Sequence, residues 1–251
     1  MLGAPSHVYE PLNEYKLFAP GIGIVDGPFE YVSALGMKLP WPFTTRMTVV
    51  QLQSGDLFLH SPTAYDAALA NRLQSLGRVR HLVSPNRGHY AHIGEWQRAF
   101  PNAIAWASPR VRERARAQRI DIHFDGDLGP NAPNEWHDDM DQAIIPGAVL
   151  HEVVFFHRRS KTLILADTIM NFELERMRQP YRFIARVGGI CSPSGGMPFD
   201  LRLALWPSRD KVRRTYERIM AWQPERIILS HGRCFETNGT AAIRRAFSWA
   251  L

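Results

Sequence analysis

Three apolar runs of the sequence each end in side chains that can bind a metal ion or transfer a proton. The run VRHLVSP leads into His89 and His92, the run KTLILAD ends in Asp167, and the run RIILSHG carries His231 near its end. Strand ends on one edge of a sheet converge, and ligand sites of layered α/β proteins form from the loops there. Two or three imidazoles with one carboxylate suit Zn²⁺, with Fe or Mn as alternatives. The sequence therefore predicts a metal site at a shared rim.

Each of these residues also has a simpler explanation. An Asp after a strand often caps the next helix, and Asp167 precedes a possible helix at NFELERM. A His before a Gly, as in His231-Gly232, often only completes a turn, and His89 could be a surface residue. Three separate strands would have to end alike by accident, however, so we favour the shared site.

The elements that would position these residues follow from apolar periodicity. Strands open the chain at 21–27, at 29–35 and in a hairpin within 47–62 that turns at residues 54–56. Helices are then expected near 69–76, 94–100, 110–119, 212–220 and 240–251, and strands at 79–85, 103–108, 149–157, 161–167 and 226–232. Two groups of strands, each followed by helices, favour two stacked sheets with helices outside. An open doubly wound sheet is the alternative.

No linker divides the chain, so residues 1–251 are expected to form a single domain. A polar stretch at 124–139 is typical of a surface loop. Residues 172–200 combine Gly-rich joints with Phe, Tyr and Arg side chains, and we predict that they form a lid or a partner-binding insertion.

Composition limits the class of protein. No apolar run approaches the roughly 20 residues of a membrane-spanning helix, and the first residues lack the pattern of a secretory signal, so a cytoplasmic location is expected. Cys191 and Cys234 are expected to be free thiols. The formal charge is +6, but the arginines are spread along the chain, which favours a small anionic ligand over nucleic acid. The oligomeric state is left open.

The order of these motifs resembles the metallo-β-lactamase superfamily, whose first loop reads His-x-His-x-Asp-His-x-Gly. If His92 and Gly94 match the last His and the Gly of that loop, His89 falls on its second His. LILADT and SHG match the later Asp and the closing His. Arg87, Ala91 and Ala148 then stand where the superfamily has metal ligands.

More narrowly, the chain is similar to a bacterial and plant family of unknown function, through phrases such as MTVVQL, GDLFLHSP and EVVFFHRRSKTLILAD. This likeness covers roughly residues 20–235. It implies an α/β (α+β) fold, the αββα four-layer sandwich, and says nothing of the substrate.

The resemblance implies a metal-dependent hydrolase with a degenerate, mononuclear site, in which hydroxide formed on the metal attacks an ester, lactone, thioester or phosphoester. The residues assigned on this basis as ligands are His89, His92, Asp167 and His231, with His151 and Glu152 as substitute ligands. Asp167 and Glu95 are assigned as proton acceptors. Arg87 and Asn86 are assigned as contacts to a small-molecule substrate, and Arg87 suits an anionic one. The alternative is a non-catalytic binding or scaffold protein that has lost its metal site and holds no ion.

Overall fold

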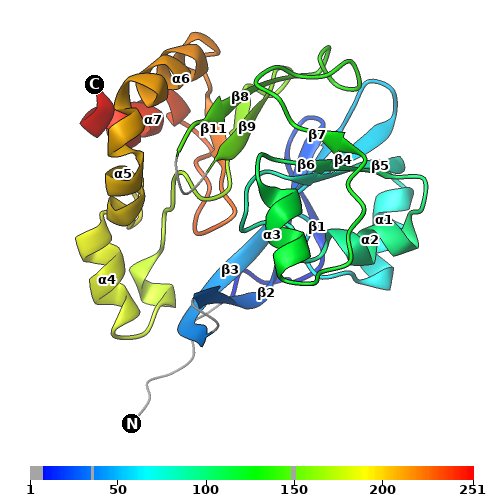
Figure 1. Cartoon of the computed structure of the whole chain (residues 1–251), viewed down its shortest axis with the longest axis horizontal. Helices are drawn as coiled ribbons and strands as arrows, with labels where there is room; N and C mark the ends of the chain where they lie inside the picture. The colour runs from blue at the N-terminus through cyan, green and yellow to red at the C-terminus, as the bar shows by residue number, and fades with distance from the viewer. Residues whose placement is uncertain (1–7, 35–36, 148–150) are drawn as a thin grey trace.

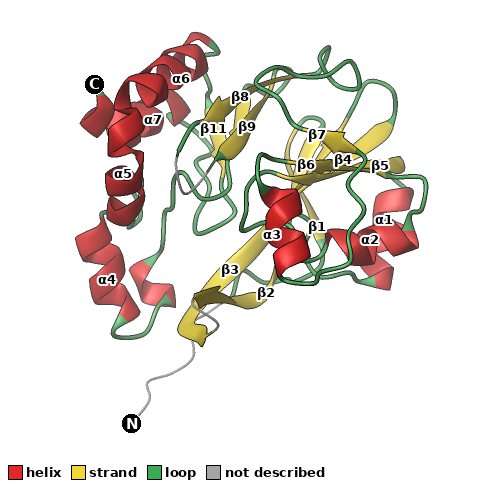
Figure 2. Ribbon diagram, viewed as in Figure 1, coloured by secondary structure: helices red, strands yellow, loops and turns green. Residues whose placement is uncertain are grey.

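The strands form two sheets that lie between two groups of helices in the computed structural model, which describes residues 8–34, 37–147 and 151–251 (Figures 1 and 2). The first sheet has the order β1-β2-β3-β4-β5-β6-β7. Its strands are β1 (Tyr15–Ala19), β2 (Ile22–Ala34), β3 (Met37–Gln51), β4 (Asp56–His60), β5 (Arg78–Ser84), β6 (Ile104–Ala107) and β7 (Gly126–Asp127). Strands β1 to β4 pair antiparallel, and β4 to β7 pair parallel through helical crossovers.

The second sheet has the order β11-β10-β9-β8. Its strands are β8 (Met140–Ile145), β9 (Glu152–His157), β10 (Thr162–Ile164) and β11 (Arg226–Ile228). The expected hairpin between the two apolar runs is confirmed, because β9 and β10 pair antiparallel with Leu163 opposite Phe156. Strand β11 returns from far along the chain and lies parallel to β10, which places Asp167 and His231 beyond neighbouring strand ends.

Helices cover the outer face of each sheet (Figure 2). Those following the first sheet's strands are α1 (Ala67–Gln74), α2 (Ile93–Ala99) and α3 (Val111–Ala117). Those on the other side are α4 (Tyr181–Gly188), α5 (Phe199–Leu205), α6 (Arg209–Ala221) and α7 (Gly239–Phe247), with short 3-10 turns η1 (Leu174–Arg176), η2 (Trp206–Ser208) and η3 (Ser248–Ala250). No helix among the described residues is long and apolar enough to cross a membrane.

Three layers of buried apolar side chains hold the sandwich together. One lies between the first sheet and its helices and includes Leu82 and Trp96, and another lies between the second sheet and its helices and includes Ile227. The third lies between the sheets, where Phe58 and Phe155 pack in edge-to-face geometry at 5.1 Å. Apolar burial on both faces of both sheets is the physical signature of four layers. The predicted αββα sandwich is therefore confirmed.

Several element boundaries differ from the predictions. The runs 21–27 and 29–35 belong to one strand, β2, whose pairing register shifts between Gly27 and Phe29; residue 35 lies outside the described part of the chain. The predicted strand 149–157 is described only from residue 151. Ala148, which stands where the superfamily has a metal ligand, lies outside the described part of the chain. Strand β1 was not predicted, because its five residues, of which Leu17 is 71 % exposed, show no apolar alternation.

The segment 172–200 is more regular than its composition suggests. It contains η1, all of α4 and the start of α5. Helix α4 buries Ala185 in a small cluster with Phe172 and Ile190, while other apolar side chains of the same helix remain exposed. The helix is only eight residues long and lies between Pro180 and Gly189, in a Gly- and Pro-rich segment whose composition is typical of a loop. Its role as a lid or partner surface stays a prediction.

Candidate metal centre

Three loops that follow β5, β10 and β11 bring two imidazoles and one carboxylate together. Within the part of the chain that the structure describes, His89, Asp167 and His231 form the group whose possible ligand atoms all lie within 4.8 Å of one another. The Oδ1 atom of Asp167 lies 3.2 Å from Nε2 of His89 and 3.1 Å from Nε2 of His231. The structure thus unites three of the four residues that the sequence assigned to a metal.

The hydrogen bonds behind the imidazoles decide which nitrogen faces the centre. The Nδ1 atom of His231 lies 2.6 Å from the carbonyl oxygen of Thr44. A carbonyl can only accept, so Nδ1 carries a proton, and in a ring with that single proton Nε2 is an acceptor. That Nε2 faces a carboxylate oxygen, and two acceptors at this distance repel unless a cation or a proton lies between them. In His89, Nδ1 lies 2.7 Å from Oγ of Ser61 and Nε2 also faces Asp167.

Asp167 is held as a carboxylate. Burial raises its pKa, but His89 and His231 outweigh burial and hold the pKa of this carboxyl well below its usual range. Its second oxygen accepts a hydrogen bond from the side-chain amide of Asn86 at 2.8 Å. The same Asn86 accepts from the backbone N–H of Gly88 at 2.7 Å, which fixes the amide's orientation. Asn86, predicted to contact substrate, is therefore placed to orient Asp167.

Glu152, predicted as a substitute ligand, has a different role. Its carboxylate is buried and accepts backbone hydrogen bonds from Ala166, Asp167 and Thr168 at 2.7 to 2.9 Å. Burial, followed by the neighbouring Asp167 carboxylate, raises the pKa of Glu152 to about 7, against the effect of those N–H donors. Because Glu152 accepts from three N–H groups, it fixes the shape of the loop that carries Asp167. Glu152 does not belong to the ligand group.

His92 and Glu95 lie outside the ligand group. His92 is the residue before α2, where its ring faces Glu95 at 3.2 Å and Glu30 at 3.1 Å. Burial lowers the pKa of His92, but the two carboxylates outweigh it and raise the pKa overall. Glu95 also accepts from the backbone N–H of Tyr65 at 3.0 Å. The prediction of His92 as a ligand is corrected, because its two ring nitrogens face Glu30 and Glu95 and it lies outside the group of His89, Asp167 and His231.

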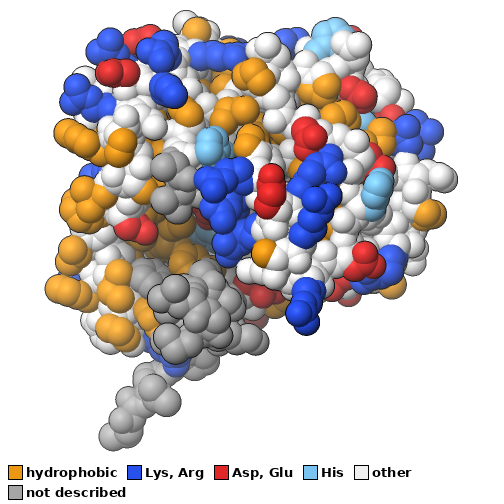
Figure 3. Space-filling view, in the orientation of Figure 1, with side chains coloured by type: hydrophobic (Ala, Val, Ile, Leu, Met, Phe, Trp, Pro, Cys, Tyr) orange, Lys and Arg blue, Asp and Glu red, His pale blue; other side chains and the backbone are white. Residues whose placement is uncertain are grey.

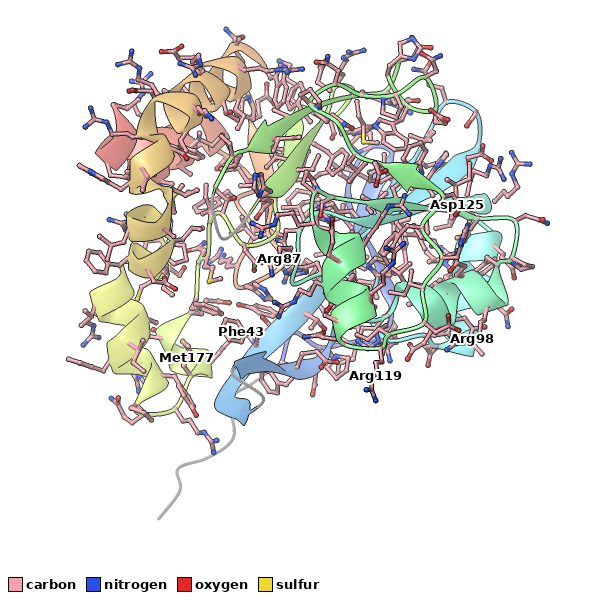
Figure 4. All side chains as sticks on the ribbon, viewed as in Figure 1. Phe43, Arg87, Arg98, Arg119, Asp125 and Met177 are labelled. Carbon is pink, nitrogen blue, oxygen red and sulfur yellow. The ribbon has the colours of Figure 1, made fainter. Side chains whose placement is uncertain are left out.

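The ring of His151 lies in a positive electrostatic environment. Burial lowers the pKa of His151, and the charges of Arg110 and Arg87 lower it further. His151 is half-buried and is not part of the ligand group. Figure 4 labels Arg87 in the central part of the molecule, between α3 and α4, and Figure 3 shows basic side chains gathered in the middle of the same face.

Other residues that position the centre carry little sequence signal. Arg46 on β3 is buried, pairs with Asp26 at 2.7 Å, and donates to the carbonyl oxygens of Leu229 and Gly232 at 2.7 Å each. It thus ties the His231 loop to the first sheet. A charged residue inside the apolar run TTRMTVV was the only hint. Gly232 has φ +88°, and a Cβ there would collide with the backbone of Asn171, so a glycine is required.

The donor set and its spacing fit a tetrahedral ion. Two ligand atoms that each lie about 2.0–2.1 Å from a tetrahedral Zn²⁺ are about 3.3 Å apart. The measured separations of Asp167 Oδ1 from the two Nε2 atoms are 3.2 and 3.1 Å. The proton that His231 donates to the Thr44 carbonyl leaves the Nε2 lone pair free for a metal, which is the usual arrangement of histidine ligands.

Comparison with known proteins gives a family and a fold. A family model described as "Domain of unknown function (DUF4336)" matches residues 39–178. No curated protein matches the chain by sequence.

Among solved structures, the chain is similar to several metallo-β-lactamases. The enzyme FIM-1 from Pseudomonas aeruginosa, in a mono-zinc form, superposes with a TM-score of 0.60 at 12 % identity, over 98 % of this chain and 95 % of that one. The enzyme from Hirschia baltica superposes with a TM-score of 0.58 at 13 % sequence identity, over 98 % of both chains. The enzyme from Pontibacter korlensis superposes with a TM-score of 0.59 at 11 % sequence identity, over 94 % of this chain and 98 % of that one. Superposition over nearly the whole of both chains establishes the metallo-β-lactamase fold. The low sequence identity leaves the reaction open.

Proposed function

Since the chain belongs to the family described as "Domain of unknown function (DUF4336)" and has the metallo-β-lactamase fold, we propose that it is a metal-dependent hydrolase with a single ion held by His89, Asp167 and His231. The observation that carries this proposal is the His231 ring, whose Nδ1 proton points at a carbonyl while Nε2 faces a carboxylate oxygen at 3.1 Å. A cation resolves that opposition. Zn²⁺ is the first choice for two imidazoles and one carboxylate, with Fe or Mn as alternatives.

A bound Zn²⁺ would lower the pKa of water from 15.7 to about 7 and polarise a carbonyl or phosphoryl group. Three protein ligands leave a fourth position open, as in other catalytic zinc sites. The chain's own residues would preserve that geometry: Thr44 keeps the proton on Nδ1 of His231, Asn86 orients Asp167, and Glu152 holds the loop beneath it. Outer hydrogen bonds of this kind set both the tautomer and the direction of the ligands.

The geometry gives no support to Asp167 as a proton acceptor, because Oδ1 faces both Nε2 atoms, Oδ2 accepts from Asn86, and the pKa of this carboxyl is held well below its usual range. Glu95 contacts His92 and the backbone N–H of Tyr65, so its position does not support a role as proton acceptor. Arg87 and Arg110, whose charges lower the pKa of His151, favour an anionic small molecule as substrate, because a guanidinium group binds a carboxylate or phosphate through two parallel N–H bonds. An ester, lactone, thioester or phosphoester that carries such a group fits this description.

The proposal is tested by metal analysis of protein purified without chelator. We expect about one ion per chain, and a loss of metal affinity of more than about 100-fold in His89→Ala, Asp167→Ala and His231→Ala, because disturbing a group that only orients a ligand already costs about 10- to 100-fold. His123→Ala is the matched control, since the side chain of His123 is 82 % exposed. Absence of stoichiometric metal, or equal metal content in all variants, would instead favour a binding protein without an ion.

The metal-loaded protein should then hydrolyse anionic esters, lactones or phosphodiesters in a screen with Zn²⁺, Mn²⁺ or Fe²⁺. Arg87→Gln should raise KM about 10-fold for an anionic substrate, which corresponds to the loss of one charged hydrogen-bonded contact of about 1.4 kcal/mol. The same change should leave KM for a neutral analogue unaltered. An equal rise in KM for both substrates would refute the role of Arg87.

A further inference from the structure

Two consecutive helices of the 172–206 region turn apolar side chains toward solvent. On α4, Phe183, Ile184 and Val187 are 64, 44 and 69 % exposed. On α5 and η2, Phe199, Leu203 and Trp206 are 57, 58 and 55 % exposed. We call these six residues the outer stripe. Phe183 and Val187 are four residues apart, and Phe199, Leu203 and Trp206 follow at i, i+4 and i+7, which sets each series along one side of the chain's helical turn.

The outer stripe is separate from the side of these helices that faces the core. Helix α4 buries Tyr181 and Ala185, and α5 buries Leu205. A helix needs only one apolar face to pack on a domain. Figure 3 shows hydrophobic side chains gathered along the left edge of the molecule, where Figure 1 places α4 and α5. Exposed apolar side chains gathered in this way mark an interaction site.

The charges around the outer stripe specify the partner. Residues 178–209 contain five arginines, one aspartate and neither lysine nor glutamate, a formal balance of +4. In the described part of the chain, Arg182 and Arg186 of α4 have no ion pair, and Arg209 lies over the Trp206 ring at 5.4 Å. Exposed apolar side chains among arginines are typical of helices that lie in the headgroup region of an anionic bilayer.

A second copy of this chain fits the same surface less well. A two-fold interface built on the outer stripe would bring the arginines of both copies, with a formal balance of +4 each, into one contact region. Like charges brought together in a desolvated interface cost several kcal/mol. An anionic lipid surface meets the arginines with the opposite charge.

We propose that the outer stripe and its flanking arginines bind the surface of an anionic lipid bilayer, with α4 and α5 lying along it. The inner side of α4 packs near Phe172, whose ring centroid lies 6.2 Å from that of Phe43, and Phe43 in turn lies 5.2 Å from His231. Helix α4 and the rings of Phe172 and Phe43 would therefore lie between the bilayer and the candidate metal centre. The inference does not depend on the hydrolase proposal, because it rests on residues that do not touch the metal group.

Co-sedimentation of the full chain with vesicles tests the proposal. We expect binding to vesicles of phosphatidylcholine mixed with phosphatidylglycerol, and much weaker binding to phosphatidylcholine alone. The double change Arg182→Ala and Arg186→Ala should weaken binding about 30-fold, or about fivefold for each arginine near the surface. Phe183→Ser and Trp206→Ser should each weaken it about 50-fold through loss of buried apolar area.

Two matched variants control for charge and for apolar surface in general. Arg116→Ala removes a charge from α3, and Leu17→Ser removes a side chain that is 71 % exposed on β1. Both should bind vesicles as the unchanged protein does. All the changed side chains are at the surface, so circular dichroism should give the same melting temperature within a few degrees for every variant.

Three results would overturn the proposal. One is the absence of binding to anionic vesicles, and another is binding that the stripe variants leave unchanged. The third is a concentration-dependent dimer, measured by sedimentation velocity, that Phe183→Ser and Trp206→Ser abolish, since the outer stripe would then be the contact between two copies of the chain.

Discussion

Two of the regions that contain histidines, one between the sheets and one at the rim of the sandwich, differ chiefly in whether a carboxylate contacts the imidazole rings. Between the sheets, His60 and His81 are buried among aromatic rings, and burial lowers their pKa values to about 3 and about 4. At the rim, burial also lowers the pKa of His89, but Asp167 outweighs it and the pKa is raised overall. The imidazole is thus kept neutral between the sheets, whereas at the rim it binds a proton or a cation more readily.

The comparison shows that burial alone does not make a metal site. His60 and His81 are as inaccessible to solvent as any ligand, yet the first has both ring nitrogens without a hydrogen-bond partner among the described residues, and the second accepts from Trp106 at 3.2 Å. What distinguishes the rim is the loop after β10, which delivers an ionised carboxylate to two imidazoles. The following predictions would break or sharpen this contrast.

The largest effect is expected from the neutral histidine in the core. Folding lowers the pKa of His81 from 6.5 to about 4, so the unfolded chain binds the proton first as the pH falls. The contribution of the neutral ring to the free energy of unfolding is fully present above pH 6.5. It falls by about 3 kcal/mol as the pH is lowered to 4. Urea unfolding of the unchanged protein and of His81→Gln across this range measures the difference.

His81→Gln keeps an acceptor for the Trp106 N–H group and removes the titration. Its free energy of unfolding should depend less steeply on pH, although His60 will still contribute a loss of its own. Identical pH dependence in both proteins would show that His81 is not held neutral, and the contrast between the two regions would fail.

An intermediate effect is expected at the rim when the loop support is changed and the ligands are kept. Glu152→Gln replaces a carboxylate that accepts from three N–H groups by an amide with one accepting oxygen, so the loop carrying Asp167 should loosen. Metal affinity should fall about 10- to 100-fold. Competition with a metal chelator measures it.

Glu225→Gln is the control, since Glu225 is an exposed carboxylate at the protein surface. A purely structural role for Glu152 would lower the melting temperature and leave metal affinity unchanged in the folded protein. That outcome would separate the buried carboxylate from the candidate metal centre.

The smallest effect is expected at His92, three residues from His89 in the sequence. His92→Ala should change metal affinity by less than about threefold, because both ring nitrogens face Glu30 and Glu95 and removing an exposed ion pair contributes little. Isothermal titration with Zn²⁺ compares it with His89→Ala. A similar loss in the two variants would restore His92 to the ligand set.

Most of the fold could be predicted from the sequence, because strands and helices of this protein bury faces with strong periodicity. The hairpin of β9 and β10, the strand β5 and the helix α6 follow directly from their apolar patterns. Helix α4 was not predicted, because it has only eight residues and lies in a Gly- and Pro-rich segment whose composition is typical of a loop. Its position in the fold is also unusual, since Phe183 and Val187 are exposed while Ala185 is buried.

The sequence by itself determined that His89, Asp167 and His231 follow strands of a layered fold, because runs of apolar residues and the residues that end them are local properties of the chain. Only the tertiary structure decided that His89 joins the group and His92 does not, because the direction of each ring depends on how the loop enters α2. It also decided that Glu152 supports a loop and that Thr44 sets the tautomer of His231, since hydrogen bonds between residues distant in sequence exist only once the two sheets have packed.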